Sequence, residues 1–310
     1  MMPSQSTHFD QAQLIPLVAG HGGYIGRFTA MGSPCEVLMK DCSETQAQQC
    51  MNIVKQEVFR IEKKYSRYSK DNVVSKINCG NGLPVVIDAE TARLIKTANA
   101  LWEVSDGLFD ITSGCLRRAW HFNGSEQFPE QKEIDGLLKY IGWNKVDWTD
   151  SYIVLPPKYE IDFGGIGKEY AADSCLELLM QSGYENVLIN LGGDIAANYV
   201  SSHAEGWRVG VESVLSSEKH DAFIDFTQGG IATSGDANKY LTIKGVRYSH
   251  VLNPQTGWPV YDAPQSVTVS AASCSEAGMY STLAMLHGVN AEEFLEDSGI
   301  QYWVQRAPSN

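Results

Sequence analysis

Four short segments of this chain combine glycine with a charged side chain or a hydroxyl, a composition suited to binding a small anion. The first, residues 162–168, reads Asp-Phe-Gly-Gly-Ile-Gly-Lys. Glycines at the start of a helix let backbone N–H groups approach a phosphate closely, and Lys168 adds a positive charge. The spacing fits neither the G-x-G-x-x-G fingerprint nor the Walker A motif. The residues alone leave two interpretations open, an anion site or a tight strand-to-helix turn with Lys168 in solvent.

The other three segments carry weaker signals when each is taken alone. Residues 191–194 (Leu-Gly-Gly-Asp) end an apolar strand with two glycines and a carboxylate, and a structural turn is the simpler interpretation. Residues 232–236 (Ala-Thr-Ser-Gly-Asp) bring two hydroxyls, a glycine and an acid together. Residues 248–257 place His250 beside hydroxyl-bearing residues and a Pro-x-Thr-Gly turn. A lone histidine is more often structural than catalytic, but no nucleophile elbow, metalloprotease helix or zinc-ligand set in the sequence competes with these segments.

The sequence pattern predicts many of the helices and strands that must position these segments. Residues 24–40 predict a strand, a turn and another strand. After Ser43, a plausible helix N-cap, apolar residues recur at spacings of three and four, which indicates a helix. A second helix is predicted over residues 89–105, with Gly107 as its stop. Residues 115–150 are mixed in pattern and receive no assignment.

The second half of the chain predicts alternating elements. Residues 158–163 predict a strand, followed by a glycine turn, a helix and an apolar strand that ends at a glycine pair. Three strands, a hairpin turning at residues 244–245 and two helices are predicted further on, at 206–213, 221–227, 229–235, 241–252, 273–288 and 290–299. We therefore expect an α+β protein, a single compact domain of mixed, largely antiparallel β-sheet with packed helices over residues 25–310, after a polar leader of residues 1–24.

Composition narrows the classes of partner and compartment. The 310 residues carry a formal net charge of -13, which argues against nucleic acid as a partner because a polyanion would be repelled. No apolar run approaches the roughly 20 residues of a membrane span, and residues 1–20 lack the pattern of a signal peptide. The seven cysteines include no C-x-x-C pair, which is typical of a reducing compartment. We expect a cytoplasmic protein.

Taken together, the four segments resemble one family. Its strings D-L-G-x-I-A-K-G, N-L-G-G-D-I, A-T-S-G-D and S-H-I-x-D-P-x-T-G-x-P occur here in the same order. Upstream, residues 31–33 resemble M-G-T, residues 59–68 resemble E-x-x-F-S-x-Y, and residues 107–112 resemble G-A-F-D-x-T. Small departures stand at Phe163, Gly167, Glu169 and Asn253. The chain is thus similar, over roughly residues 25–300, to the ApbE family of flavin transferases, the FAD:protein FMN transferases.

This resemblance implies an activity and a set of site residues. Members of the family bind FAD and magnesium, split the pyrophosphate, and attach FMN through a phosphoester to a threonine or serine of an acceptor flavoprotein. The positions that match its FAD contacts are Met31, Tyr68, Leu108, Phe109, Asp110, Asp162, Lys168 and Leu252. Tyr68 suits stacking on a flavin or adenine ring, Asp162 suits a ribose or ring N–H, and Lys168 suits a phosphate. His250 matches the position near the reacting phosphate, as base or as charge stabiliser.

The cation site departs from the family pattern. The family's late helix reads A-D-A-x-A-T, and its aspartate and threonine lie on one helical face and hold the metal. Here Ser281 and Thr282 are in place and the Gly165 carbonyl can contribute, but the aspartate position is Gly278. Because Mg²⁺ prefers anionic oxygen ligands, this loss should weaken the site. Glu276 lies two residues earlier, and so faces roughly the opposite side of a regular helix.

The sequence is compatible with three functions. The first is an active transferase with a modified metal site, the second an FAD-binding protein without transferase activity, and the third an FAD pyrophosphatase that releases FMN and AMP. If position 278 faces the cation, Gly278→Asp should restore the anionic ligand one turn before Thr282 and lower the magnesium requirement. The identity of the acceptor lies in the partner and cannot be inferred from this chain.

Overall fold

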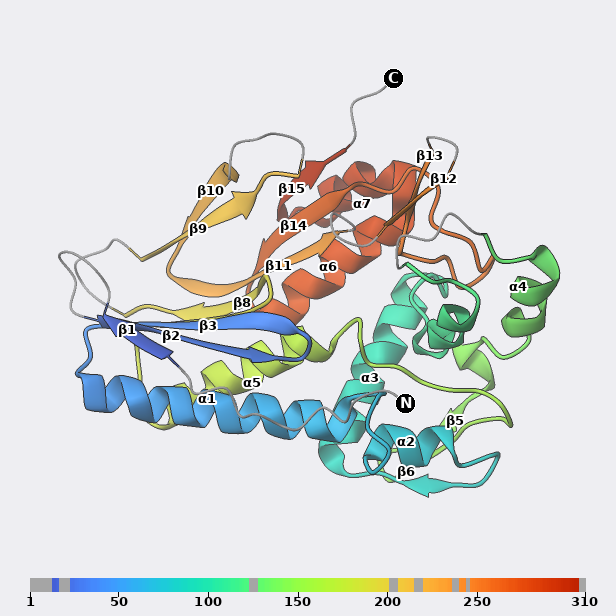
Figure 1. Cartoon of the computed structure of the whole chain (residues 1–310), viewed down its shortest axis with the longest axis horizontal. Coiled ribbons are helices and arrows are strands. Elements are labelled where there is room, and N and C mark those ends of the chain that lie inside the picture. The colour runs from blue at the N-terminus through green and yellow to red at the C-terminus, as the bar shows by residue number, and fades with distance from the viewer. Residues whose placement is uncertain are drawn as a thin grey trace, which may run out of the picture.

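An eight-stranded antiparallel sheet forms the centre of the computed structural model (Figure 1), which describes residues 13–16, 23–122, 128–200, 206–214, 220–235, 240–243 and 246–306. Its strand order is β1-β2-β3-β7-β8-β11-β14-β15. These strands are β1 (Gln13–Pro16), β2 (Gly23–Ala30), β3 (Ser33–Lys40), β7 (Val187–Leu191), β8 (Asp194–Asn198), β11 (Gln228–Gly235), β14 (Ser266–Ala271) and β15 (Gln301–Gln305). The expected α+β class with an antiparallel sheet is confirmed, and the segment assigned to the leader contributes β1.

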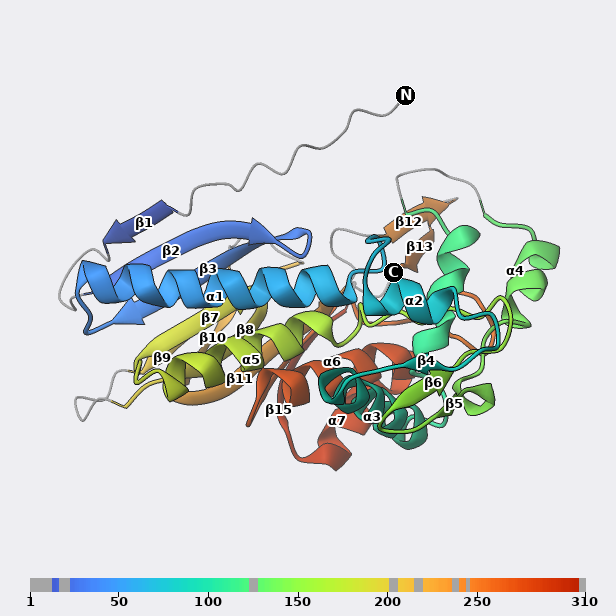
Figure 2. The same cartoon turned by 90° about the horizontal axis from the view of Figure 1, so that it is seen from below.

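Helices cover one face of this sheet, and a small two-stranded sheet lies over part of the other. The helices are α1 (Glu44–Tyr65), α2 (Val73–Asn78), α3 (Ala89–Val104), α4 (Gln131–Leu138), α5 (Gly167–Gln181), α6 (Cys274–His287) and α7 (Ala291–Ser298). In sheet order, α1 packs on β2, α5 on β7 and β8, and α6 on β11 and β14, with α5 in contact with both neighbours (Figure 2). On the opposite face, Trp207, Val211 and Ile224 of β9 (Trp207–Glu212) and β10 (His220–Phe226) belong to a cluster with Leu188 and Ile231.

The long first helix begins and ends as its sequence predicts. The Ser43 side chain caps α1 by accepting a hydrogen bond from the backbone N–H of Gln46, and the side-chain oxygen of Gln46 accepts one from the backbone N–H of Ser43. Val54, Val58 and Ile61 are fully buried along one stripe of the helix. Each such side chain contributes roughly 1.5–3 kcal/mol on burial, so the stripe fixes the helix against the sheet.

The region without a sequence assignment folds into short elements. It holds the 3₁₀ helix η1 (Ile111–Arg118), α4, a second 3₁₀ turn η2 (Trp143–Lys145), and β5 (Asp147–Trp148), which pairs with β6 (Tyr152–Val154) beside β4 (Val85–Val86). Cys115, Leu116, Trp120 and Ile134 form its own small core. A 3₁₀ helix has three residues per turn, so its buried residues follow neither the helical nor the strand period.

One predicted strand is wrong and one predicted hairpin is confirmed. Residues 158–163 belong to no strand: Lys158 lies in a turn at a φ of 72°, and the burial does not alternate, since Glu160 is buried together with Tyr159 and Ile161. The Asn78 side chain bonds both backbone groups of Ile161, and the Ile111 carbonyl accepts from the N–H of Asp162, so no sheet partner is needed. The predicted hairpin is formed by β12 (Tyr240–Ile243) and β13 (Val246–Ser249); its turn residues, 244 and 245, lie outside the described residues.

Two further features complete the fold. The two helices predicted at 273–288 and 290–299 are α6 and α7. A one-turn 3₁₀ helix, η3 (Gly288–Asn290), joins them. None of the helices in the described ranges combines the length and the apolar composition needed to cross a membrane.

A charged cluster ties α1, α3 and α5 together. Glu90 of α3 accepts hydrogen bonds from Arg60 and Lys64 of α1 and, at 2.7 Å, from the Tyr170 hydroxyl of α5. Its side chain is 14% exposed. These donors, with the Arg60 contact as the largest effect, hold the pKa of Glu90 well below its ordinary value of 4.5. The cluster therefore fixes the first turn of α5 relative to two other helices.

We expect Glu90→Gln to lower the free energy of unfolding by about 2 kcal/mol at pH 7, since hydrogen bonds to a charged group are lost. Because the pKa of Glu90 is lowered on folding, its contribution is complete above pH 4.5 and fades as the pH falls further. Urea unfolding of both proteins from pH 7 to pH 3 measures this. A difference that stays constant or grows in acid would contradict the assignment.

Candidate functional site

The glycine segment before α5 forms a close junction of three parts of the chain. Helix α5 starts at Gly167, and no side chain caps its N-terminus. A Cβ on Gly165 would stand 3.2 Å from the Phe109 ring, and one on Gly167 would stand 3.9 Å from the Met31 methyl group. Met31 lies in the β2–β3 turn at a φ of 51°, where its N–H donates to Glu62 Oε1 at 2.9 Å. Two predicted FAD contacts, Met31 and Phe109, thus lie against the predicted phosphate turn.

Asp162 is bound within the protein by an arginine that the sequence reasoning missed. Arg67 pairs with one oxygen of Asp162 and donates to the Tyr68 hydroxyl at 2.8 Å. The other oxygen of Asp162 accepts from the N–H of Gly164 at 3.0 Å. The Arg67 guanidinium lies over one face of the Tyr68 ring, 4.9 Å from its centroid, and because Tyr68 is 79% exposed the ring still suits stacking on a planar ligand. The sequence offered one indication that Arg67 belongs to the site: it directly precedes Tyr68 in the motif.

The first turn of α5 carries Lys168 and Glu169, and Asp194 of β8 lies beside it. The Lys168 ammonium is 3.6 Å from Asp194 Oδ2, at the start of β8 after the Gly192–Gly193 turn. Burial raises the pKa of Asp194, while the charge of Lys168 opposes that rise. Burial also raises the pKa of Glu169, and the negative charge of Asp194 raises it further. The first two sequence segments therefore meet at this helix end.

The third segment lies beside α6. Ser234 of β11 has its hydroxyl 2.9 Å from that of Ser281 and 3.0 Å from that of Thr282. The Ser281 hydroxyl also donates to the carbonyl of Gly278 at 3.1 Å. Asp236, the acid of this segment, lies outside the described residues. Glu276 accepts from the N–H of Ala272 at 3.1 Å in the cap of α6, so it is occupied away from this cluster.

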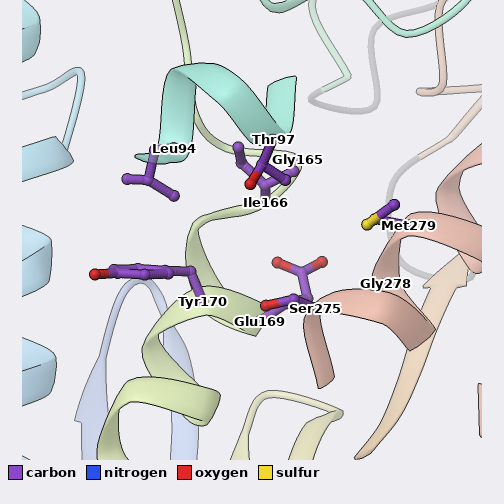
Figure 3. A pocket seen from close by; sticks show the side chains of 9 residues that line it. All are labelled: Leu94, Thr97, Gly165, Ile166, Glu169, Tyr170, Ser275, Gly278 and Met279. Carbon is purple, nitrogen blue, oxygen red and sulfur yellow. The ribbon is translucent and has the colours of Figure 1, made fainter. Parts of the chain in front are cut away.

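A small cavity of about 30 Å³ lies between α3, α5 and α6 (Figure 3). The Glu169 carboxylate points into it. It is lined by Leu94, Thr97, Gly165, Ile166, Glu169, Tyr170, Ser275, Gly278 and Met279. The cavity thus joins Gly165, a predicted cation ligand, to Gly278, the position at which the sequence lacks an aspartate.

The fourth segment packs against the loop that carries Leu108. Gln255 donates to the carbonyl of Asp106 at 2.9 Å, and Trp120 donates to that of Gly257 at 2.8 Å. The His250 ring meets Phe122 edge-on, with centroids 6.2 Å apart. Leu252 forms an isolated bridge to Pro259. The segments at 107–112 and 248–257, far apart in sequence, are therefore neighbours.

The side chain of Asp110 has a structural role in this geometry. One of its oxygens accepts from the N–H and hydroxyl of Thr112, and the other accepts from the N–H of Trp143 at 2.9 Å. Burial raises its pKa despite these bonds. The carboxylate thereby caps η1 and fixes the position of its neighbour Phe109, which contacts Gly165.

Comparison with known proteins agrees with this arrangement. The model of the ApbE family matches residues 31–304. The chain belongs to the ApbE family. A relative from Escherichia coli K12, named FAD:protein FMN transferase, is 30% identical over 251 residues, covering 77% of this chain and 71% of the relative. One from Haemophilus influenzae, with the same name, is 27% identical and covers 79% and 74%.

Solved structures of ApbE proteins share the fold. The ApbE protein of Thermotoga maritima superposes with a TM-score of 0.80 at 28% identity, covering 96% of this chain and 97% of that chain. The flavinyl transferase ApbE of Pseudomonas stutzeri gives 0.83 at 23% identity, covering 94% and 93%. The resemblance first seen in short strings therefore extends over nearly the whole architecture.

The two glycines of the turn should respond differently to alanine. Gly167→Ala meets only ordinary van der Waals contact with Met31, and we expect it to raise the free energy of unfolding by about 0.5 kcal/mol, because alanine favours a helix. Gly165→Ala forces the Phe109 ring to shift, and we expect a loss of about 1 kcal/mol. Thermal unfolding of both variants checks the order; equal effects would contradict the packing described.

Proposed function

We propose that this protein transfers FMN from FAD to a serine or threonine hydroxyl of an acceptor flavoprotein, with Mg²⁺ as cofactor. The observation that carries the proposal is the convergence of Met31, Phe109 and Lys168 on the N-terminus of α5 in a chain of this family. A helix N-terminus with a neighbouring cation is suited to the pyrophosphate of FAD. The exposed Tyr68 ring, held by Arg67, suits stacking on a ring of the dinucleotide.

The reaction is a phosphoryl transfer with a simple balance. The acceptor hydroxyl oxygen attacks the phosphorus of the FMN half, the anhydride bond to the AMP phosphate breaks, and AMP leaves as the FMN phosphoester forms. The hydroxyl proton needs a base, and His250 is the residue we propose for it, or for stabilising the charge that develops on the phosphate. Lys168 and the N–H groups of α5 bind the oxygens of the pyrophosphate.

The oxygen donors predicted from the sequence suit magnesium. The Gly165 carbonyl and the hydroxyls of Ser281 and Thr282 are the hard ligands that Mg²⁺ prefers, and such sites use one or two carboxylates together with substrate phosphates. When bound, the cation would neutralise charge on the pyrophosphate. In the described residues no group of three or more His, Cys, Asp and Glu side chains converges, so this part of the chain holds no all-carboxylate cage for the ion.

The proposal is tested by incubating the protein with FAD, Mg²⁺ and a candidate acceptor flavoprotein. Mass spectrometry of the acceptor and chromatography of AMP are the two readouts. The proposal expects one FMN phosphoester on the acceptor for each AMP released. AMP and FMN released without labelling would favour a pyrophosphatase, and FAD binding without either product would favour a flavin-binding protein.

Lys168→Ala should weaken FAD binding about tenfold at low salt, because a charged contact to phosphate is lost. Lys168→Arg should retain most of the affinity. Flavin fluorescence quenching measures the dissociation constants, and Lys132→Ala, an exposed lysine of α4, is the control. Since Asp194 loses its partner as well, thermal melts must accompany the titrations. An unchanged affinity for FAD in a folded Lys168→Ala protein would show that Lys168 has a structural role and does not bind the phosphate.

A further inference from the structure

Two departures from the family strings touch each other in the structure. Glu169 replaces a glycine at the end of D-L-G-x-I-A-K-G, and Gly278 replaces the aspartate of A-D-A-x-A-T. The first lies in α5 and the second in α6, and these helices pack together. A Cβ built on Gly278 would stand 2.5 Å from Cγ of Glu169 and 2.9 Å from its Oε1. The Glu169 side chain therefore fills the space that a side chain at position 278 would occupy.

Glu169 is not explained by structural pairing. The residue is 8% exposed, and within the described ranges no ion pair involves its carboxylate. Burial raises the pKa of this carboxyl, and its own backbone N–H opposes that rise. The neighbouring Lys168 is directed to Asp194 instead. Burying a carboxylate without an ion pair costs several kcal/mol, so stability alone does not account for this residue.

The carboxylate is aimed at a site with other oxygen donors. It points into the cavity of about 30 Å³ that Gly165 and Ser275 also line (Figure 3). This volume suits one small ion or about one water molecule. A carboxylate and a hydroxyl are oxygen donors that Mg²⁺ takes when substrate phosphates supply the rest, and Gly165, whose carbonyl is a predicted ligand, lines the same cavity.

We propose that Glu169 supplies the carboxylate ligand of the divalent-cation site, from α5 rather than from position 278 of α6. The inference rests on the proposed function, because the cation serves the phosphates of FAD. Oε1 of Glu169 lies 2.9 Å from the Cβ that an aspartate at 278 would have, so a carboxylate from α5 stands beside the position from which one on α6 would extend. The glycine at 278 is then required, since it leaves the room that the longer side chain uses.

This arrangement overturns the expectation that Gly278→Asp alone restores a metal ligand. The new Cβ would collide with Cγ of Glu169, and two carboxylates would share one buried space. The single variant should lose stability and cation affinity together. Only the double variant Glu169→Gly/Gly278→Asp, which exchanges both residues, is expected to bind the cation as the wild type does.

Mn²⁺ binding to the FAD complex, followed by electron paramagnetic resonance without acceptor, tests the proposal. Glu169→Gln keeps the shape of the side chain and should weaken Mn²⁺ at least tenfold. Glu177→Gln, at an exposed position of α5, is the matched control and should change nothing. Glu169→Gly should also lose Mn²⁺, and the double variant should recover it to within about threefold. An unchanged Mn²⁺ affinity in Glu169→Gln, or no recovery in a folded double variant, would overturn the proposal.

Failure of the ligand assignment can be told from failure of the proposed function. If the Glu169→Gln protein binds Mn²⁺ normally and still transfers FMN, Glu169 is not a cation ligand, and the proposed transferase function is supported. Mn²⁺ binding that depends on Glu169, in a protein that neither labels an acceptor nor releases AMP, would support the ligand and reject the transferase.

Discussion

The contact between the Glu169 side chain and the bare backbone of Gly278 is the constraint on which the rest of the site depends. It sets how closely α5 approaches α6, and it holds a carboxylate in the cavity beside Gly165. Any side chain at 278 would displace that carboxylate. Because Lys168 lies in the same first turn of α5, a shift of Glu169 would also move Lys168 and the helix N-terminus that we propose for phosphate binding.

Helix α5 can hold both residues in place because it lies between α1 and α6 on the sheet and contacts both helices. Its buried face packs on β7 and β8, whose connecting turn delivers Asp194 to Lys168. Tyr170 ties it to Glu90 of α3, and Glu90 is bound in turn by α1. The glycine turn before the helix receives Met31 from the first hairpin and Phe109 from the loop before η1. Packing thus brings segments that are distant in sequence together at the N-terminus of α5.

Much of this could be predicted from the sequence, and the misses have physical causes. The long amphipathic helix, both main hairpins and α5 follow from periodicity and glycine placement, which are local signals. Residues 158–163 alternate like a strand, yet Asn78 supplies the hydrogen bonds of Ile161, and a side chain distant in sequence leaves no local trace. The pairing of Arg67 with Asp162 was missed for the same reason. Glu169 was visible as a departure, as was Gly278, but only contact between their helices shows that one compensates for the other.

The central claim, that the carboxylate of the cation site comes from α5, is tested most directly by a crystal structure of the wild-type protein with FAD and Mn²⁺. The anomalous signal of manganese locates the ion without reference to activity. The account predicts an ion in the cavity between Gly165 and Gly278, coordinated by an oxygen of Glu169 and by phosphate oxygens of FAD. An ion bound at the pyrophosphate with Glu169 outside its coordination sphere would contradict the account.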